Sequence, residues 1–88
     1  MNEVPIRIKY LVNFLDITGK REEVFPFARG SDLNTLAQWL KNTYGIDPGA
    51  PNVLFLINGH GWAQNPLGMK RELKEGDTVI LMPLLSGG

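Results

Sequence analysis

The stretch LKEGDTVILMPLLSGG, residues 73–88, joins a turn, a strand and a diglycine end. The KEGD sequence at 74–77 has the composition of a tight turn, and the apolar run at 78–82 predicts a strand directly after it. Gly87 and Gly88 are a poor end for a folded element, because glycine has no side chain to bury and loses the most backbone entropy on ordering. Without a Cβ, however, the chain can enter a narrow channel, so Gly88 is suited to offer a carboxylate to another protein.

Upstream of this stretch, the sequence pattern predicts three further strands. Residues 6–12 alternate between apolar and polar side chains, with Val12 on the apolar face, which indicates a half-buried strand. A turn at 18–20 and a second strand over 22–27 would complete a hairpin. Residues 53–57 form a continuous apolar run that favours a central strand.

One main helix is expected between the second and third strands. Ser31 and Asp32 supply an N-cap signal, and Gly45 is well placed to end the helix. The residues between them form one apolar stripe at helical spacing: Leu33, Leu36, Ala37, Leu40 and Tyr44.

The order strand, strand, helix, strand, strand predicts an α+β fold, with the helix packed across one face of a mixed sheet. This is the ubiquitin-like β-grasp arrangement, in which the first and last strands lie side by side. We expect one β-grasp domain over 1–83 and a flexible diglycine tail over 84–88. Residues 58–70 are the least readable part of the chain.

The sheet face opposite the helix is a candidate binding surface. Leu11 lies on the otherwise polar face of the first strand, and Ile80 and Met82 share one face of the last strand. If the two strands are neighbours, these three residues could form an apolar patch for a partner beside the tail. The alternative is that the 59–70 loop covers Leu11 or Ile80.

Composition excludes several classes of protein. Nine basic and nine acidic residues give no net charge, so nothing indicates a nucleic-acid or membrane surface. No apolar run is long enough to span a bilayer, and the N-terminus has no secretory signal. The absence of cysteine is compatible with the cytoplasm and excludes thiolate metal sites. His60 lies between two glycines without a second histidine, so we expect a loop residue and no metal site.

Residues 73–88 resemble the C-terminal signature of the MoaD/ThiS sulfur-carrier family. That signature has a Leu-x-x-Gly-Asp-x-Val turn and strand, a proline, a short apolar stretch and a terminal diglycine. The helix segment SDLNTL at 31–36, followed by Leu40, is also similar to the family. The expected order of elements extends the resemblance over the whole chain.

The resemblance implies that the chain is a carrier and synthase small subunit, with no enzymatic activity and no bound cofactor of its own. An activating enzyme related to those of ubiquitin would adenylate the Gly88 carboxylate with ATP, and a sulfurtransferase would supply the sulfur for a thiocarboxylate. The acceptor would be the large subunit of molybdopterin synthase. Gly87 would allow close passage through the active site. The partner-binding residues would be Leu11, Ile80, Met82, Pro83, Leu84, Leu85 and Ser86.

Two departures from the family pattern keep other functions open. Molybdopterin-type members often carry two consecutive prolines before the tail, whereas Leu84 follows Pro83 here, and the 59–70 loop is longer than in compact members. The alternatives are a sulfur carrier for thiolated tRNA, thiazole, cysteine or a specialised metabolite, a ubiquitin-like modifier of lysines, and a β-grasp interaction module with an incidental diglycine.

Overall fold

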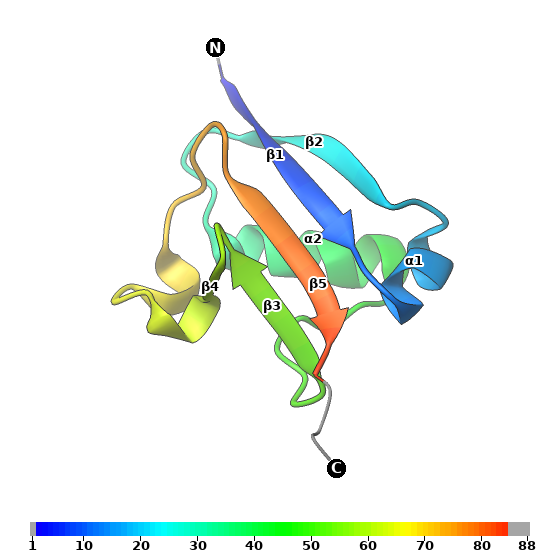
Figure 1. Ribbon diagram of the computed structural model, residues 1–88. Coiled ribbons are helices and arrows are strands. Elements are labelled where there is room, and N and C mark those ends of the chain that lie inside the picture. Colours follow the sequence, from blue (N-terminus) through cyan, green and yellow to red (C-terminus); the bar gives the residue numbers. More distant parts are fainter. Residues whose placement is uncertain (1, 85–88) are drawn as a thin grey trace.

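The computed structural model describes residues 2–84 of the chain (Figure 1). Its elements are, in order, β1 (Glu3–Tyr10), α1 (Asn13–Thr18), β2 (Glu22–Ala28), α2 (Leu33–Tyr44), β3 (Val53–Ile57), β4 (His60–Gly61), the short 3-10 helices η1 (Trp62–Gln64) and η2 (Gly68–Lys70), and β5 (Thr78–Pro83).

The strands form one five-stranded sheet in the order β2-β1-β5-β3-β4. The first and last strands, β1 and β5, lie side by side and run parallel, whereas the other neighbours are antiparallel. Helix α2 crosses one face of this sheet and leaves the other face open (Figure 1). The β-grasp arrangement expected from the sequence is therefore confirmed.

Helix α2 begins and ends at the predicted residues. The Asp32 carboxylate accepts a hydrogen bond from the Thr35 backbone N–H at 3.0 Å, and Gly45 ends the helix with a φ of 71°. Ala37 and Tyr44 of the expected stripe are only partly buried. The buried core between α2 and the sheet comprises Val4, Ile6, Ile8, Tyr10, Phe14, Phe27, Leu33, Leu36, Leu40, Ile46, Phe55, Ile57, Leu73, Val79 and Leu81.

The expectation of a strand through Val12 is wrong. Strand β1 ends at Tyr10, and the chain turns at Val12, which has a φ of 57°, into helix α1, which the sequence did not predict. Phe14 of α1 is buried in the core, whereas Val12 is 62% exposed. A buried aromatic side chain thus holds the short helix in place, and Val12 does not join the core face.

The 59–70 segment packs at the edge of the sheet and against α2. Asn58 and Gly59 both have positive φ, as a two-residue hairpin turn requires, and this turn sets β4 against β3. Trp62 and Met69 then pack against the core, and η2 contacts α2. The segment is thus a packed part of the domain.

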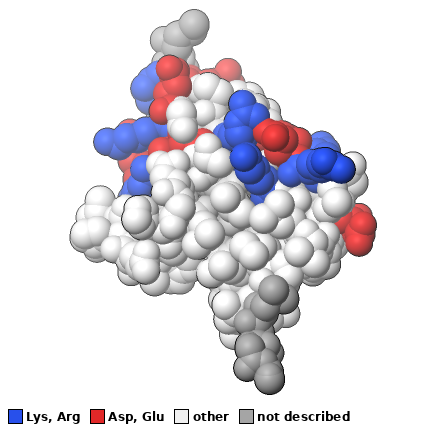
Figure 2. All heavy atoms as spheres, in the orientation of Figure 1, with Lys and Arg blue, Asp and Glu red and all other residues white. Residues whose placement is uncertain are grey.

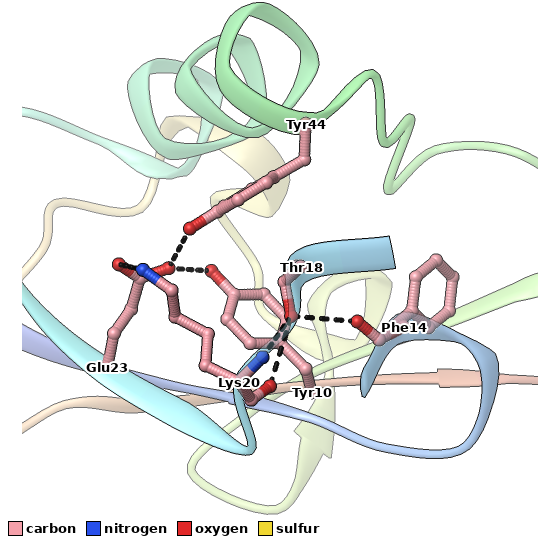
Figure 3. Close-up of polar contacts among 6 residues, drawn as sticks. All are labelled: Tyr10, Phe14, Thr18, Lys20, Glu23 and Tyr44. Carbon is pink, nitrogen blue, oxygen red and sulfur yellow. Dashed lines mark hydrogen bonds and ion pairs between the residues drawn. The ribbon is translucent and has the colours of Figure 1, made fainter. Parts of the chain in front are cut away.

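A polar cluster links β1, β2 and α2 (Figure 3). The hydroxyls of Tyr10 and Tyr44 donate to the same oxygen of Glu23 at 2.5 and 2.6 Å, and the Lys20 ammonium lies 3.4 Å from the other oxygen. Burial and the bond to Glu23 raise the pKa of Tyr10. Burial alone would raise the pKa of Glu23, but the hydrogen bonds from Tyr10 and Tyr44 outweigh it and lower that pKa. The cluster fastens the end of α2 to the hairpin.

Candidate functional site

The last strand, β5, ends at Pro83, four residues before the first glycine of the diglycine in the sequence. Pro83 pairs with Val53 of β3, and the Leu84 N–H donates to the Asn52 carbonyl at 2.9 Å. The Leu84 side chain is 54% exposed. The sheet therefore holds the backbone through Leu84, while the side chain of that residue faces solvent. The predicted site residues Leu85, Ser86, Gly87 and Gly88 lie outside the described residues.

Around the base of the tail, apolar side chains occupy the open face of the sheet. Ile80 and Met82 of β5 pair with Leu56 and Leu54 of β3, and all four are partly exposed. On the other side of β5, the Leu11 N–H donates to the Leu81 carbonyl at 3.0 Å, and Leu11 is 40% exposed. We call these five residues, Leu11, Leu54, Leu56, Ile80 and Met82, the tail-base patch.

The structure thus brings together the three patch residues that the sequence proposed. The alternative, in which the 59–70 segment buries Leu11 or Ile80, does not hold, because both keep access to solvent and that segment packs against α2. Leu54 and Leu56 were missed. Phe55 is buried, so strict alternation along β3 would have placed Leu54 and Leu56 on the open face. A continuous apolar run, however, is typical of a strand that is covered on both faces.

Charged side chains border the tail-base patch on its β1 side, where Lys9 pairs with Ile80, but are absent from the β3 and β5 segments that form most of it. The chain carries no Lys, Arg, Asp or Glu between Asp47 and Lys70 or after Asp77. Figure 2 shows the result on the open face: charged groups gather over its upper half, and the half nearest the end of β5 has almost none. Arg7, which pairs with Thr78 at the start of β5, forms an ion pair with Glu22. A partner that covers this half needs an apolar, uncharged surface of its own.

The start of β5 is fixed by Asp77. Its buried carboxylate accepts two bonds from Arg71, at 2.7 and 3.1 Å, and further bonds from the Lys74 backbone and the Asn58 side chain at 2.8 and 2.9 Å. The Asn58 side chain also accepts from the Thr78 N–H at 2.9 Å. Burial alone would raise the pKa of Asp77, but these hydrogen bonds and the Arg71 charge lower it. Asp77 thereby sets the register from which β5 runs to the tail.

Other parts of the described chain offer weaker candidate sites. A pocket of about 390 Å³ lies between the β3–β4 turn and η1, with His60, Gln64 and Arg71 among its lining residues. Arg71 is already paired with Asp77. Within residues 2–84, no group of three or more His, Cys, Asp or Glu side chains is placed to hold a metal ion. No helix in the same range is long and apolar enough to cross a membrane.

Solved structures share this fold over nearly their whole length. A protein named molybdopterin converting factor, subunit 1, from Pyrococcus furiosus is 24% identical, with a TM-score of 0.75 over 93% of this chain and 99% of that one. Small archaeal modifier protein 1 from Methanosarcina acetivorans is 19% identical, with a TM-score of 0.76 over all of both chains. Urm1 from Trypanosoma brucei is 23% identical, with a TM-score of 0.68 over 100% of this chain and 99% of that one.

No curated protein matches the chain. The model of the ThiS family does match it, over residues 8–88, and these include the Gly76-Asp77 turn, β5 and the diglycine. The resemblance seen in the sequence is therefore confirmed, and the protein belongs to the ThiS family of ubiquitin-fold sulfur carriers.

Proposed function

We propose that this protein carries sulfur as a thiocarboxylate on Gly88 for the synthesis of molybdopterin. A Gly88 carboxylate oxygen attacks the α-phosphorus of ATP and pyrophosphate leaves, which gives an acyl-adenylate. A hydrosulfide equivalent supplied by a sulfurtransferase then displaces AMP. The acceptor is the large subunit of molybdopterin synthase. In this proposal the chain binds no cofactor, because ATP belongs to the activating enzyme.

The observation that carries the proposal is the place where β5 ends. The Leu84 backbone is held by the sheet next to an apolar, uncharged patch, and the family's diglycine follows within a few residues. Residues 84–88 can span about 17 Å at ~3.3–3.6 Å per residue, which is long enough to reach into an enzyme docked on the patch. Glycine at 87 and 88 would pass a narrow channel.

Apart from the Gly88 carboxylate, the proposed reaction requires no reactive group from this chain. A carboxylate is a poor electrophile, and adenylation supplies the leaving group that lets sulfur attack the acyl carbon. The thiocarboxylate is itself a sulfur nucleophile, so the carrier needs no cysteine, and it has none. This composition is also compatible with a reducing cytoplasm, where we place the reaction.

Pro83 before the tail and the likeness to the protein named molybdopterin converting factor, subunit 1, support the molybdopterin pathway over the alternatives. The second candidate is a protein modifier, in which a lysine amine attacks the activated Gly88 carbon and forms an isopeptide bond. The likeness to small archaeal modifier protein 1 favours it. Both functions share the same activated carbon and differ in the nucleophile.

A gene deletion in the source organism separates these functions. Loss of molybdopterin, with thiolated tRNA bases and thiazole unchanged, is the expected result, and wild-type protein but not a variant without Gly88 should restore it. Loss of tRNA thiolation alone would contradict the molybdopterin assignment. Immunoblots showing Gly88-dependent ladders of conjugates, with molybdopterin levels unchanged, would establish the modifier instead.

A further inference from the structure

Val12 has a backbone conformation that its side chain disfavours. Of residues 2–84, only Val12 and Asn58 combine positive φ with a residue other than glycine. Asn58 belongs to the Asn-Gly turn between β3 and β4, where positive φ is required. Val12, with φ 57° and ψ −122°, is β-branched, and in that region a β-branched residue is a clear outlier.

The fold explains why the chain turns at position 12, but it does not explain why the residue there is valine. The chain must turn between Leu11, whose N–H is bound to Leu81 of β5, and Phe14, which is buried. Glycine would make the same turn without strain. Valine adds strain, and because its side chain is 62% exposed, packing within this chain does not compensate for it. The apolar side chain is thus explained best by a contact outside this chain.

The place of Val12 indicates which partner makes that contact. Leu11 belongs to the tail-base patch, and α1 lies beside the end of β5 from which the tail departs (Figure 1). Because residues 84–88 span at most about 17 Å, an enzyme acting on Gly88 must cover the surface around the tail base. Adenylation is the first reaction that Gly88 undergoes in the proposed function.

We propose that Val12 is a contact residue for the adenylating enzyme, and that its strained backbone presents the side chain as an apolar extension of the tail-base patch. The inference rests on the proposed function, and it adds a contact outside the sheet that neither the strand pattern nor the diglycine motif indicates. The complementary surface on the enzyme is apolar and uncharged, as for the rest of the patch.

The test compares Val12→Gly, Val12→Ala and the control Val24→Ala with the wild-type carrier. Val24 is 52% exposed on the edge strand β2, which β1 separates from β5. It pairs with Arg7, far from the end of β5 that carries the tail. The measurements are the thermal unfolding midpoint and ATP-dependent pyrophosphate release by the cognate adenylating enzyme, at varied carrier concentration.

In Val12→Gly, the release of backbone strain should outweigh the smaller cost of the greater backbone entropy of glycine, so Tm should rise by a few degrees. The KM for the carrier should nevertheless rise at least about fivefold, with kcat unchanged. Val12→Ala should raise KM similarly with a smaller change in Tm, and Val24→Ala should leave KM unchanged. A wild-type KM in Val12→Gly, or a Tm that does not rise, would overturn this inference alone. A wild-type carrier that supports no pyrophosphate release would overturn the proposed function, and this inference with it.

Discussion

The two ends of β5 differ in what surrounds them: polar contacts within the chain at the start, and partly exposed apolar side chains at the end. At its start, the buried carboxylate of Asp77 is fully engaged by Arg71, Asn58 and the Lys74 backbone. At its other end, Leu84 is held by its backbone, and its side chain lies exposed beside an uncharged apolar patch. At the first end, the buried carboxylate finds all its hydrogen-bond partners within the chain, whereas the second end leaves apolar side chains partly exposed, where a partner can cover them. We therefore expect changes at the first end to affect stability and changes at the second to affect activation.

The largest effect is expected from removal of Gly88. Adenylation should be lost completely, because the shortened chain ends in a Gly87 carboxylate one residue short of the reacting position. Tm should stay within about 2 °C, since the last strand ends at Pro83, five residues before Gly88 in the sequence. Pyrophosphate release and thermal unfolding check the two parts. A truncated carrier that unfolds, or one that is still activated, would contradict the separation of the two ends.

Asp77→Ala should break the other end of the strand. It leaves the partly buried Arg71 guanidinium without its carboxylate partner and removes the bonds to Asn58 and Lys74, so the free energy of unfolding should fall by about 3 kcal/mol. Urea denaturation measures this loss. Glu75→Ala, exposed in the same turn, should change it by less than about 0.5 kcal/mol. Activation per folded molecule should persist in both variants.

Met82→Asp places a charge in the tail-base patch. The KM for the carrier should rise about tenfold, since a desolvated, unpaired carboxylate weakens an apolar interface, and Tm should change little at this partly exposed position. Val24→Asp, on the charged half of the same face, is the matched control and should leave KM unchanged. Equal KM values for Met82→Asp and wild type, with both folded, would show that the patch is not the docking surface.

Acidification should weaken the start of β5 selectively. The folded-state pKa of Asp77 lies below the ordinary value of about 3.9, so its contribution is fully present above that value and is lost as the pH falls through it toward the folded-state pKa. Unfolding free energies measured between about pH 6 and 3 should therefore fall less steeply in Asp77→Asn than in wild type. Glu23, whose pKa is also lowered, should retain part of the dependence. Identical slopes would contradict the role given to Asp77.

Local chemistry made some of this structure predictable from sequence. Helix α2 was predictable because Asp32 caps it, Gly45 ends it, and Leu36 and Leu40 recur at the helical period. The pairing of β1 with β5 followed from the order of elements, and that pairing placed Leu11 near Met82.

The failures have equally physical causes. Alternation assigned Val12 to the core, because a side-chain pattern does not reveal where the backbone turns, and α1 has one buried aromatic residue and too few residues for a helical period. The partners of Asp77 were missed because they come from a turn, an irregular segment and the end of β3. The diglycine was found in the sequence alone, since Gly87 and Gly88 lie outside the described residues.

The most direct test is the intact mass of the protein after incubation with ATP, its adenylating enzyme and a sulfur source. We expect the mass to increase by the replacement of one oxygen by sulfur, and fragmentation to place the change at Gly88. An unmodified C-terminus, under conditions that convert another ThiS-family carrier, would contradict the account.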